Sequence, residues 1–266
     1  MTRPLGVTNL AWPPEALDIA LPLLARLGCT AVEIAPWAVF GRWHDLADDA
    51  RRLRDRIAAH GLTCTALQGI LFGTENLALF GPPEARARLD RHLETVAALA
   101  GHLGAHACVL GAPRQRDPGD LAPAAAWDIA TATLRRLGPA FAANASALAV
   151  EANARHYACR FITTTAEAIR LVQHVGTPGI GLQIDTGTIF LEHEPPEILL
   201  QVAPLAVHAH ISEPDLHPPG TLDHTAIATA LQASGYTGSL SIEMRRTENW
   251  QQAITAAVAF AKATYP

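Results

Sequence analysis

Long hydrophobic runs and a strong net charge are both missing from this sequence. No stretch of about 18 apolar residues occurs without a charged or helix-breaking residue, which argues against a membrane-spanning helix. The formal net charge is only -5, which argues against a general nucleic-acid-binding surface. The start, Met1-Thr2-Arg3-Pro4, leads directly into an apolar segment without a signal-peptide cleavage pattern. We therefore expect a cytoplasmic protein that binds neither membranes nor nucleic acid.

Cysteine is also scarce. The four cysteines, Cys29, Cys64, Cys108 and Cys159, are widely spaced and lie in apolar stretches, a pattern that excludes a zinc knuckle or a disulfide framework. We expect them to be reduced residues of the core. Hydrophobic residues make up 49% of the chain and charged residues 17%, so the composition is that of a folded protein with ample core material.

Short apolar segments rich in strand-forming residues alternate along the whole chain with longer segments of helical period. The predicted strands are Leu5–Leu10, Ala31–Ala35, Thr63–Gln68, Ala107–Gly111, Ala147–Glu151, Gly181–Asp185, Ala206–Ile211 and Ser239–Glu243. The predicted helices are Pro14–Leu27, Asp45–His60, Pro83–Leu103, Leu121–Ala143, Thr165–His174, Pro195–Gln201, Leu222–Ala233 and Glu248–Thr264. Glycines follow several of these helices, as expected at left-handed C-terminal caps: Gly28, Gly61, Gly104 and Gly235.

Eight strand–helix units in 266 residues correspond to about 33 residues per unit. This count predicts one (β/α)₈ TIM barrel that occupies residues 1–266 as a single domain. A doubly wound open sheet would also alternate strands and helices. It is less favoured here because Ala11-Trp12-Pro13-Pro14, and not a glycine-rich dinucleotide-binding turn, follows the first strand.

Polar residues stand near the ends of the predicted strands, where a barrel of this kind carries its chemistry. They are Glu33, Gln68, Glu151, Asp185, His208 with His210, and Glu243, from the second, third, fifth, sixth, seventh and eighth strands. Buried parallel strands normally end in apolar residues, so this concentration in the second half of the chain indicates a site.

Four of these residues have the chemistry of metal ligands. Glu151, Asp185, His210 and Glu243 are 34, 25 and 33 residues apart, about one strand–helix unit each. Side chains from four adjacent barrel strands can converge on one cation. Three carboxylates and one imidazole favour Mn²⁺ or Mg²⁺, with Co²⁺ or Zn²⁺ also possible. The competing interpretation is that each acid is an ordinary solvated or ion-paired residue.

The spacing does not decide which histidine would bind the metal. His208 and His210 are two residues apart on one strand, so both point to the same face. One of them would be a ligand, and the other would be a supporting or core histidine.

Several segments together resemble the xylose isomerase-like TIM barrels. They are Val150-Glu151-Ala152-Asn153, Gln183-Ile184-Asp185-Thr186-Gly187, Val207-His208-Ala209-His210-Ile211-Ser212-Glu213 and Ser241-Ile242-Glu243-Met244. The group includes sugar and sugar-phosphate isomerases and epimerases, ketose 3-epimerases, inosose isomerases and dehydratases, and endonuclease IV. The resemblance extends over nearly the whole chain.

This resemblance implies one divalent metal ion held by Glu151, Asp185, His210 and Glu243. It further implies that Glu151 and Glu243 are the catalytic residues, which move a proton to and from a metal-bound enediolate of the substrate. The expected activity is that of an isomerase or epimerase acting on a sugar, a sugar phosphate or a related polyol carbonyl compound. Barrels of this group often pair, so a homodimer is possible.

Other positions depart from the patterns of individual subgroups. Where ketose epimerases carry residues that hold sugar hydroxyl groups, this chain has Tyr157, Thr188 and Leu216. The substrate is therefore expected to differ from a free ketohexose. Gln68 and Gly111 stand about where endonuclease IV has metal-binding histidines, which argues against a DNA-repair role.

The remaining polar residues near the strand ends are candidates for substrate binding. They are Glu33, Gln68, Asn153, His208 and Arg116. Arg116 lies in the loop after the fourth strand, where a guanidinium can bind a phosphate or carboxylate, although a solvated loop arginine is equally compatible with the sequence.

Two alternatives to an isomerase remain open from the sequence. The same metal and base would serve a dehydratase acting on a keto-cyclitol-like substrate, which would release water. A non-catalytic barrel that binds a metabolite is the third possibility, and it would hold no divalent ion.

Overall fold

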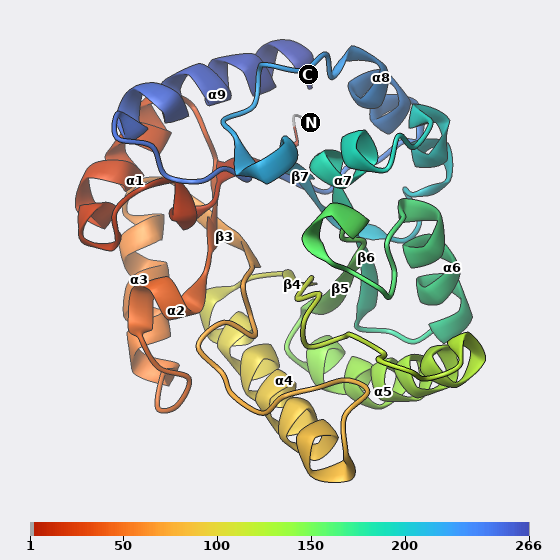
Figure 1. Ribbon diagram of the computed structural model, residues 1–266. Coiled ribbons are helices and arrows are strands. Elements are labelled where there is room, and N and C mark those ends of the chain that lie inside the picture. The colour runs from red at the N-terminus through yellow and green to blue at the C-terminus, as the bar shows by residue number, and fades with distance from the viewer. Residues whose placement is uncertain (1–2, 266) are drawn as a thin grey trace.

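A computed structural model describes residues 3–265 as eight parallel strands surrounded by helices (Figure 1). Met1, Thr2 and Pro266 belong to the predicted domain but lie outside the described residues. Met1 and Thr2 are also part of the start at which no signal peptide was expected. The strands are β1 (Leu5–Val7), β2 (Ala31–Ile34), β3 (Thr63–Leu67), β4 (Ala107–Leu110), β5 (Ala147–Glu151), β6 (Ile180–Asp185), β7 (Ala206–Ile211) and β8 (Ser239–Ile242). The α-helices are α1 (Leu17–Arg26), α2 (Pro36–Phe40), α3 (Ala47–Ala58), α4 (Pro83–Leu103), α5 (Pro123–Ala143), α6 (Thr165–Val175), α7 (Thr186–Leu191), α8 (Thr225–Ala233) and α9 (Trp250–Thr264).

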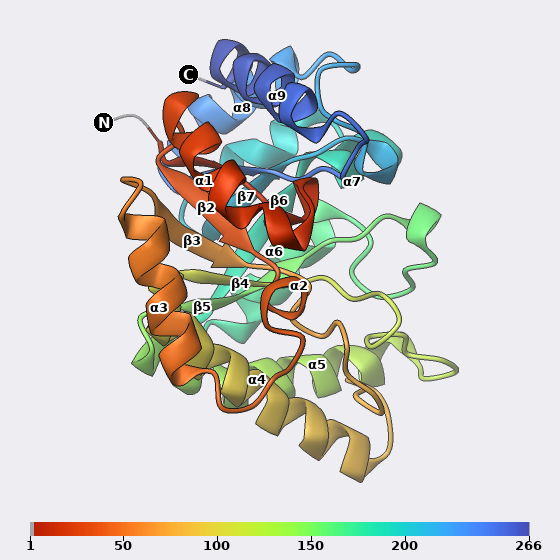
Figure 2. The ribbon, with the colours of Figure 1, turned by 90° about the vertical axis from the view of Figure 1, so that its left-hand side faces the viewer.

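The strands follow one another around the ring in the order β1-β8-β7-β6-β5-β4-β3-β2. A bridge between Thr8 and Glu33 and a hydrogen bond of 3.0 Å from Thr30 N to Leu5 O join β1 to β2. The structure is therefore the predicted single (β/α)₈ barrel. In Figure 2 the short helices α2 and α7, which directly follow β2 and β6, lie toward the right-hand end of the strands. None of the helices in residues 3–265 is both long and apolar enough to cross a membrane.

The predicted helix ends agree with the structure where glycine or proline marks them. Helix α4 begins at Pro83 and ends at Leu103, and the next residue, Gly104, caps it with a left-handed φ of 78°. The first strand is shorter than predicted, because the Thr8 hydroxyl accepts a hydrogen bond from Leu10 N and caps a 3-10 helix over Asn9–Ala11. The helix predicted from Pro195 to Gln201 is also a 3-10 helix, Pro196–Gln201. Helices α2 and α7 were not predicted, because they are too short to show a period.

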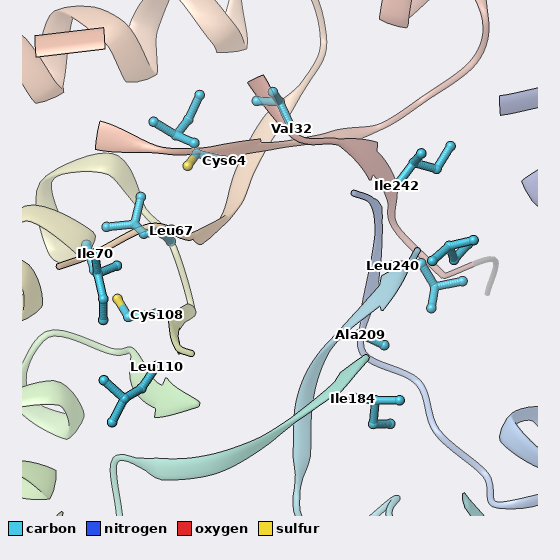
Figure 3. Close-up of a cluster of buried hydrophobic side chains, with 14 of the residues drawn as sticks. Val32, Cys64, Leu67, Ile70, Cys108, Leu110, Ile184, Ala209, Leu240 and Ile242 are labelled. Atoms are coloured by element: carbon cyan, nitrogen blue, oxygen red, sulfur yellow. The ribbon is translucent and has the colours of Figure 1, made fainter. Parts of the chain in front are cut away.

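Large apolar side chains fill the space between the strands and the surrounding helices. Figure 3 shows part of this cluster, with Val32, Leu67 and Ile242 among the labelled residues. Phe141 of α5 and Leu24 of α1 belong to it and are fully buried. We call this cluster the outer core. All four cysteines are buried and free, as predicted.

A second, smaller cluster lies apart from the outer core. It consists of Ala66, Ala107 and Ala149, with Val207 packed against it. Much of what else is buried on the strands is polar, including Glu33, Gln183, His208 and Ser241. Small and polar side chains thus replace the branched aliphatic layers that commonly fill such barrels.

An irregularity between β6 and β7 aligns the residues of the predicted site. Leu182 pairs with Ala206, but Gln183 pairs with His208 and Asp185 with His210, so Val207 is an extra residue in β7. Because of this bulge, both histidines lie beside polar residues of β6. Asp185 and His210 consequently are direct neighbours across the two strands.

Candidate metal centre and active site

A cavity of about 270 Å³ opens at the carboxyl ends of the strands. Its wall includes the polar residues Glu151, His210 and Glu243 and the apolar residues Ile70, Leu71 and Phe72 from the loop after β3. Gln68, the first residue after β3, also lines it. The cavity therefore combines an acidic wall, an imidazole and an apolar wall.

His210 is the centre of the acidic wall. Its Nδ1 lies 3.4 Å from Glu151 Oε1 and 3.2 Å from Glu243 Oε2. Nδ1 is buried, yet within the described residues it makes no hydrogen bond of ordinary geometry. This nitrogen thus lies within 3.4 Å of one oxygen of each glutamate at the cavity wall.

Asp185 is the last residue of β6 and also caps helix α7. Its Oδ1 accepts hydrogen bonds from Gly187 N, at 2.9 Å, and from the Ser212 hydroxyl. Its Oδ2 accepts a hydrogen bond of 3.2 Å from Thr188 Oγ1. These donors fix the carboxylate beside His210, its partner in the ladder.

Burial and neighbouring charges shift the pKa values of Asp185 and His210. Burial, followed by the charges of Glu151 and Glu243, raises the pKa of Asp185 to about 7. Burial alone would lower the pKa of His210, but the nearby carboxylates Glu33 and Glu243 outweigh it, and the pKa is raised well above the ordinary value. Such crowding of acids in a buried place is relieved by a positive charge among them.

The other ring nitrogen of His210 points to Glu33. His210 Nε2 lies 3.0 Å from Glu33 Oε1, and His208 Nε2 lies 3.6 Å from the same oxygen. Burial would raise the pKa of Glu33, but His210 and His208 outweigh it and hold the pKa well below its usual range. Glu33 is therefore an ionised carboxylate that accepts the Nε2 proton of His210. This contact leaves Nδ1 as the nitrogen that faces the cavity.

The ligand atoms of Glu33, His208 and His210 lie within 4.8 Å of one another, close enough to hold a metal ion. Glu33 and His208 are fully buried inside the barrel and do not line the cavity, so only His210 of this group reaches it. The group around His210 Nδ1 does line it. The two groups share one imidazole and lie on its opposite sides.

The buried polar contacts continue from His208 toward the amino ends of the strands. His208 Nδ1 lies 2.6 Å from Ser239 Oγ, which in turn lies 3.1 Å from His106 Nε2. His106 is half-buried and immediately precedes β4. Ser239 and His106 were not anticipated from the sequence, since neither stands near the carboxyl end of a predicted strand.

The predicted substrate-binding residues fall into different environments. Gln68 lines the cavity, and its amide Nε2 donates to Thr8 Oγ1 at 2.7 Å. Asn153 Nδ2 donates to Glu151 Oε2 at 2.8 Å. Glu33 and His208 are enclosed in the barrel, where no substrate atom reaches them in this arrangement.

Arg116 lies at the carboxyl ends of β4 and β5, as predicted for the loop after β4, but its side chain is buried. It is only 4% exposed and donates to protein acceptors, among them Glu151 O at 2.6 Å and Asn153 Oδ1 at 2.7 Å. A loop arginine is usually solvated, but this side chain folds back beneath the loop. The sequence contains no signal for that reversal.

Comparison with known proteins agrees with the fold. The sequence pattern of the xylose isomerase-like TIM barrel family matches residues 21–264. No curated protein sequence matches the chain. Among solved structures, an L-ribulose 3-epimerase is similar with a TM-score of 0.83 and 22% identity, over 100% of this chain and 95% of that one.

Two further epimerase structures are similar to a comparable degree. D-psicose 3-epimerase from Clostridium cellulolyticum H10, solved with D-tagatose, has a TM-score of 0.83 and 18% identity, over 98% of this chain and 99% of that one. A 3-keto-D-glucoside 4-epimerase from E. coli has a TM-score of 0.80 and 21% identity, over 98% of this chain and 100% of that one. At these identities the likeness establishes the shared fold, and the family match over residues 21–264 shows that the chain belongs to the xylose isomerase-like TIM barrel family.

Proposed function

We propose that this protein is a divalent-metal-dependent isomerase or epimerase of a small carbohydrate. The observation that carries the proposal is the position of His210 Nδ1, which faces Glu151 and Glu243 at the wall of a cavity. A cavity of about 270 Å³ suits a molecule of sugar size better than a polymer. The solved neighbours named above are epimerases of keto sugars, which supports this class of substrate.

The residues around His210 Nδ1 fit a divalent cation. The buried nitrogen lacks a hydrogen-bond partner among the described residues, and two carboxylate oxygens lie within 3.4 Å of it. Asp185 adds a third carboxylate whose pKa is raised by burial and by Glu151 and Glu243, the expected result when acids are crowded without a neutralising charge. Glu151, Asp185, His210 and Glu243 would hold the ion. Their oxygen-rich set favours Mn²⁺ or Mg²⁺ over the softer ions.

Glu33 orients His210 for this task. An imidazole that donates one N–H to a carboxylate presents its other nitrogen as a more basic ligand in a fixed direction. The full burial of Glu33 and its distance of 3.0 Å to His210 Nε2 match that role. We therefore favour the Nδ1 side over the enclosed group of Glu33, His208 and His210 as the catalytic site, because only the Nδ1 side meets the cavity.

The proton transfer is assigned to the two glutamates. A bound divalent ion would polarise the substrate carbonyl and so lower the pKa of the adjacent C–H. Glu151 and Glu243 approach His210 from β5 and from the end of β8, so they reach the cavity from different directions. One glutamate removes the C–H proton, and the other returns a proton to the opposite face or to the neighbouring carbon.

The proposal is tested by metal analysis combined with isotope exchange. Protein freed of metal and reloaded with Mn²⁺ is incubated with a panel of keto sugars in D₂O, and deuterium entry at carbon is followed by NMR. We expect exchange that depends on Mn²⁺ and falls by roughly 100-fold or more in Glu151→Gln or Glu243→Gln. Glu197→Gln, which changes an exposed glutamate, is the control and should exchange at the normal rate.

Other outcomes separate the alternatives. A product that has lost water would identify a dehydratase instead of an isomerase. A protein that binds no divalent ion and shows no Mn²⁺-dependent shift in melting temperature would contradict the enzymatic proposal and favour a metabolite-binding barrel.

A further inference from the structure

Behind the acidic wall lies a buried guanidinium with well-defined partners. Arg116 Nη1 donates to Glu151 O at 2.6 Å and to Leu110 O at 3.3 Å. Its Nη2 donates to Asn153 Oδ1 at 2.7 Å and approaches Cys159 Sγ at 3.7 Å. The two nitrogens of the fork thus bridge the end of β4, the end of β5 and the residues that follow β5. A buried charge held by this many acceptors serves a defined geometric purpose.

The bond to Arg116 determines how the Asn153 amide is oriented. The guanidinium only donates hydrogen bonds, so the Asn153 oxygen must face it. The amide NH₂ is thereby directed to the other side, where Nδ2 donates to Glu151 Oε2 at 2.8 Å. A flipped amide would place its oxygen against the carboxylate and its NH₂ against the guanidinium, and both contacts would be repulsive. The chain Arg116–Asn153–Glu151 therefore has one favourable arrangement.

Gly111 provides the space that this arrangement needs. A Cβ on residue 111 would lie 2.4 Å from Glu151 Oε2 and 3.2 Å from Asn153 Oδ1. Such an approach is too close for a side chain, so either the carboxylate or the amide would have to move. The requirement is steric, because Gly111 is absent from the glycines with positive φ.

We propose that Arg116 and Asn153 are positioning residues that hold the Glu151 carboxylate in one orientation toward His210, in the space left by Gly111. The inference rests on the proposed role of Glu151 as a metal ligand and proton carrier. It assigns Arg116 to the rear of the site instead of to the substrate. It also accounts for an arginine at this position, since a lysine has no planar fork to bridge Glu151 O and Asn153 Oδ1.

The test uses Asn153→Ala, which removes the donor to Glu151 Oε2, and Gly111→Ala, which places a methyl group against the same oxygen. We expect both variants to bind Mn²⁺ roughly 10- to 100-fold more weakly by titration calorimetry, as is typical when a support of a metal ligand is removed. The turnover number of both variants should also fall, while KM for the substrate changes less. The melting temperature of metal-free Gly111→Ala should change little, because the displaced atom is the end of a flexible side chain.

Arg116→Met is the direct variant, and it should show the same loss of Mn²⁺ affinity together with lower stability. The matched control is Arg114→Met, which removes an exposed arginine from the same loop and should behave as the parent.

Three results would overturn the inference, and they can be distinguished from one another. Unchanged Mn²⁺ affinity and turnover in Asn153→Ala and Gly111→Ala, with both quantities lost in Glu151→Gln, would reject the positioning role alone. A fall in melting temperature without a change in Mn²⁺ affinity or turnover would do the same, because it would show a structural role only. Unchanged affinity and turnover in Glu151→Gln would reject the proposed function and the inference together.

Discussion

The outer core and the buried polar residues of the strands belong to the same barrel but differ in how well their buried atoms are satisfied. The outer core consists of aliphatic and aromatic side chains such as Leu24 and Phe141, packed between strands and helices. Among the buried strand residues, several polar atoms have no hydrogen-bond partner in the described part of the chain, namely Glu33 Oε2, Thr65 Oγ1, Gln183 Oε1, His208 Nε2 and Ser241 Oγ. Burial of such atoms lowers stability.

This difference indicates that the outer core stabilises the fold and that the buried polar strand residues lower its stability. Apolar burial in the outer core drives folding, and its residues need only suitable size and shape. The polar strand residues oppose folding but place Glu33, His208 and His210 in mutual contact. Substitutions in the two regions should consequently separate stability from metal binding.

The largest effect is expected from a cavity in the outer core. Phe141→Ala removes a fully buried ring from α5, and we expect the free energy of unfolding to fall by about 3–5 kcal/mol. Mn²⁺ affinity of the folded protein should stay at the parent value, since Phe141 belongs to the packing between helices and strands. Denaturant unfolding and calorimetry measure the two quantities. Leu200→Ala, at a residue that is 52% exposed, is the control. A strong loss of metal affinity in Phe141→Ala would show that the two regions are coupled.

A smaller effect, on Mn²⁺ affinity instead of on stability, is expected inside the barrel. Glu33→Gln keeps the size of the side chain but removes the negative charge that accepts the Nε2 proton of His210. We expect Mn²⁺ affinity to fall by roughly 10- to 100-fold, because His210 Nδ1 becomes a weaker and less oriented ligand. The exposed Glu84→Gln serves as the control in the same titration. Equal Mn²⁺ affinities for Glu33→Gln and the parent would contradict the proposed role of Glu33 in orienting His210.

The smallest effect is a gain in stability at the site itself. The raised pKa of Asp185, about 7, means that the folded metal-free protein retains a proton that the unfolded chain releases near pH 4. The contribution of Asp185 to stability therefore declines as pH rises from about 4 to about 7. We expect metal-free Asp185→Asn to be more stable than the parent by about 1–2 kcal/mol near neutral pH and to lose this advantage near pH 4. Melting curves in EDTA across this range provide the measurement, and a less stable variant at neutral pH would contradict the electrostatic account.

The sequence alone was sufficient for the barrel. Alternation of strand and helix periods is a local property, and residues such as Pro83 and Gly104 mark boundaries that do not depend on distant contacts. The carboxyl ends of the strands lie on one side of such a barrel, so the positions of Glu151 and Asp185 near the site follow from the chain order. The short helices α2 and α7 escaped prediction because one or two turns carry no measurable period.

The tertiary structure decided the contacts on which the chemistry depends. Only the bulge at Val207 places His210 beside Asp185, and only the closed ring brings Glu33 of β2 to His210 of β7. From the sequence Arg116 is either a substrate-binding or a solvated loop arginine, whereas in the fold its side chain turns inward to Glu151 O and Asn153. The physical reason is that secondary structure and strand order follow from neighbouring residues, whereas ring nitrogens, hydrogen-bond donors and buried charges are oriented by partners far away along the chain.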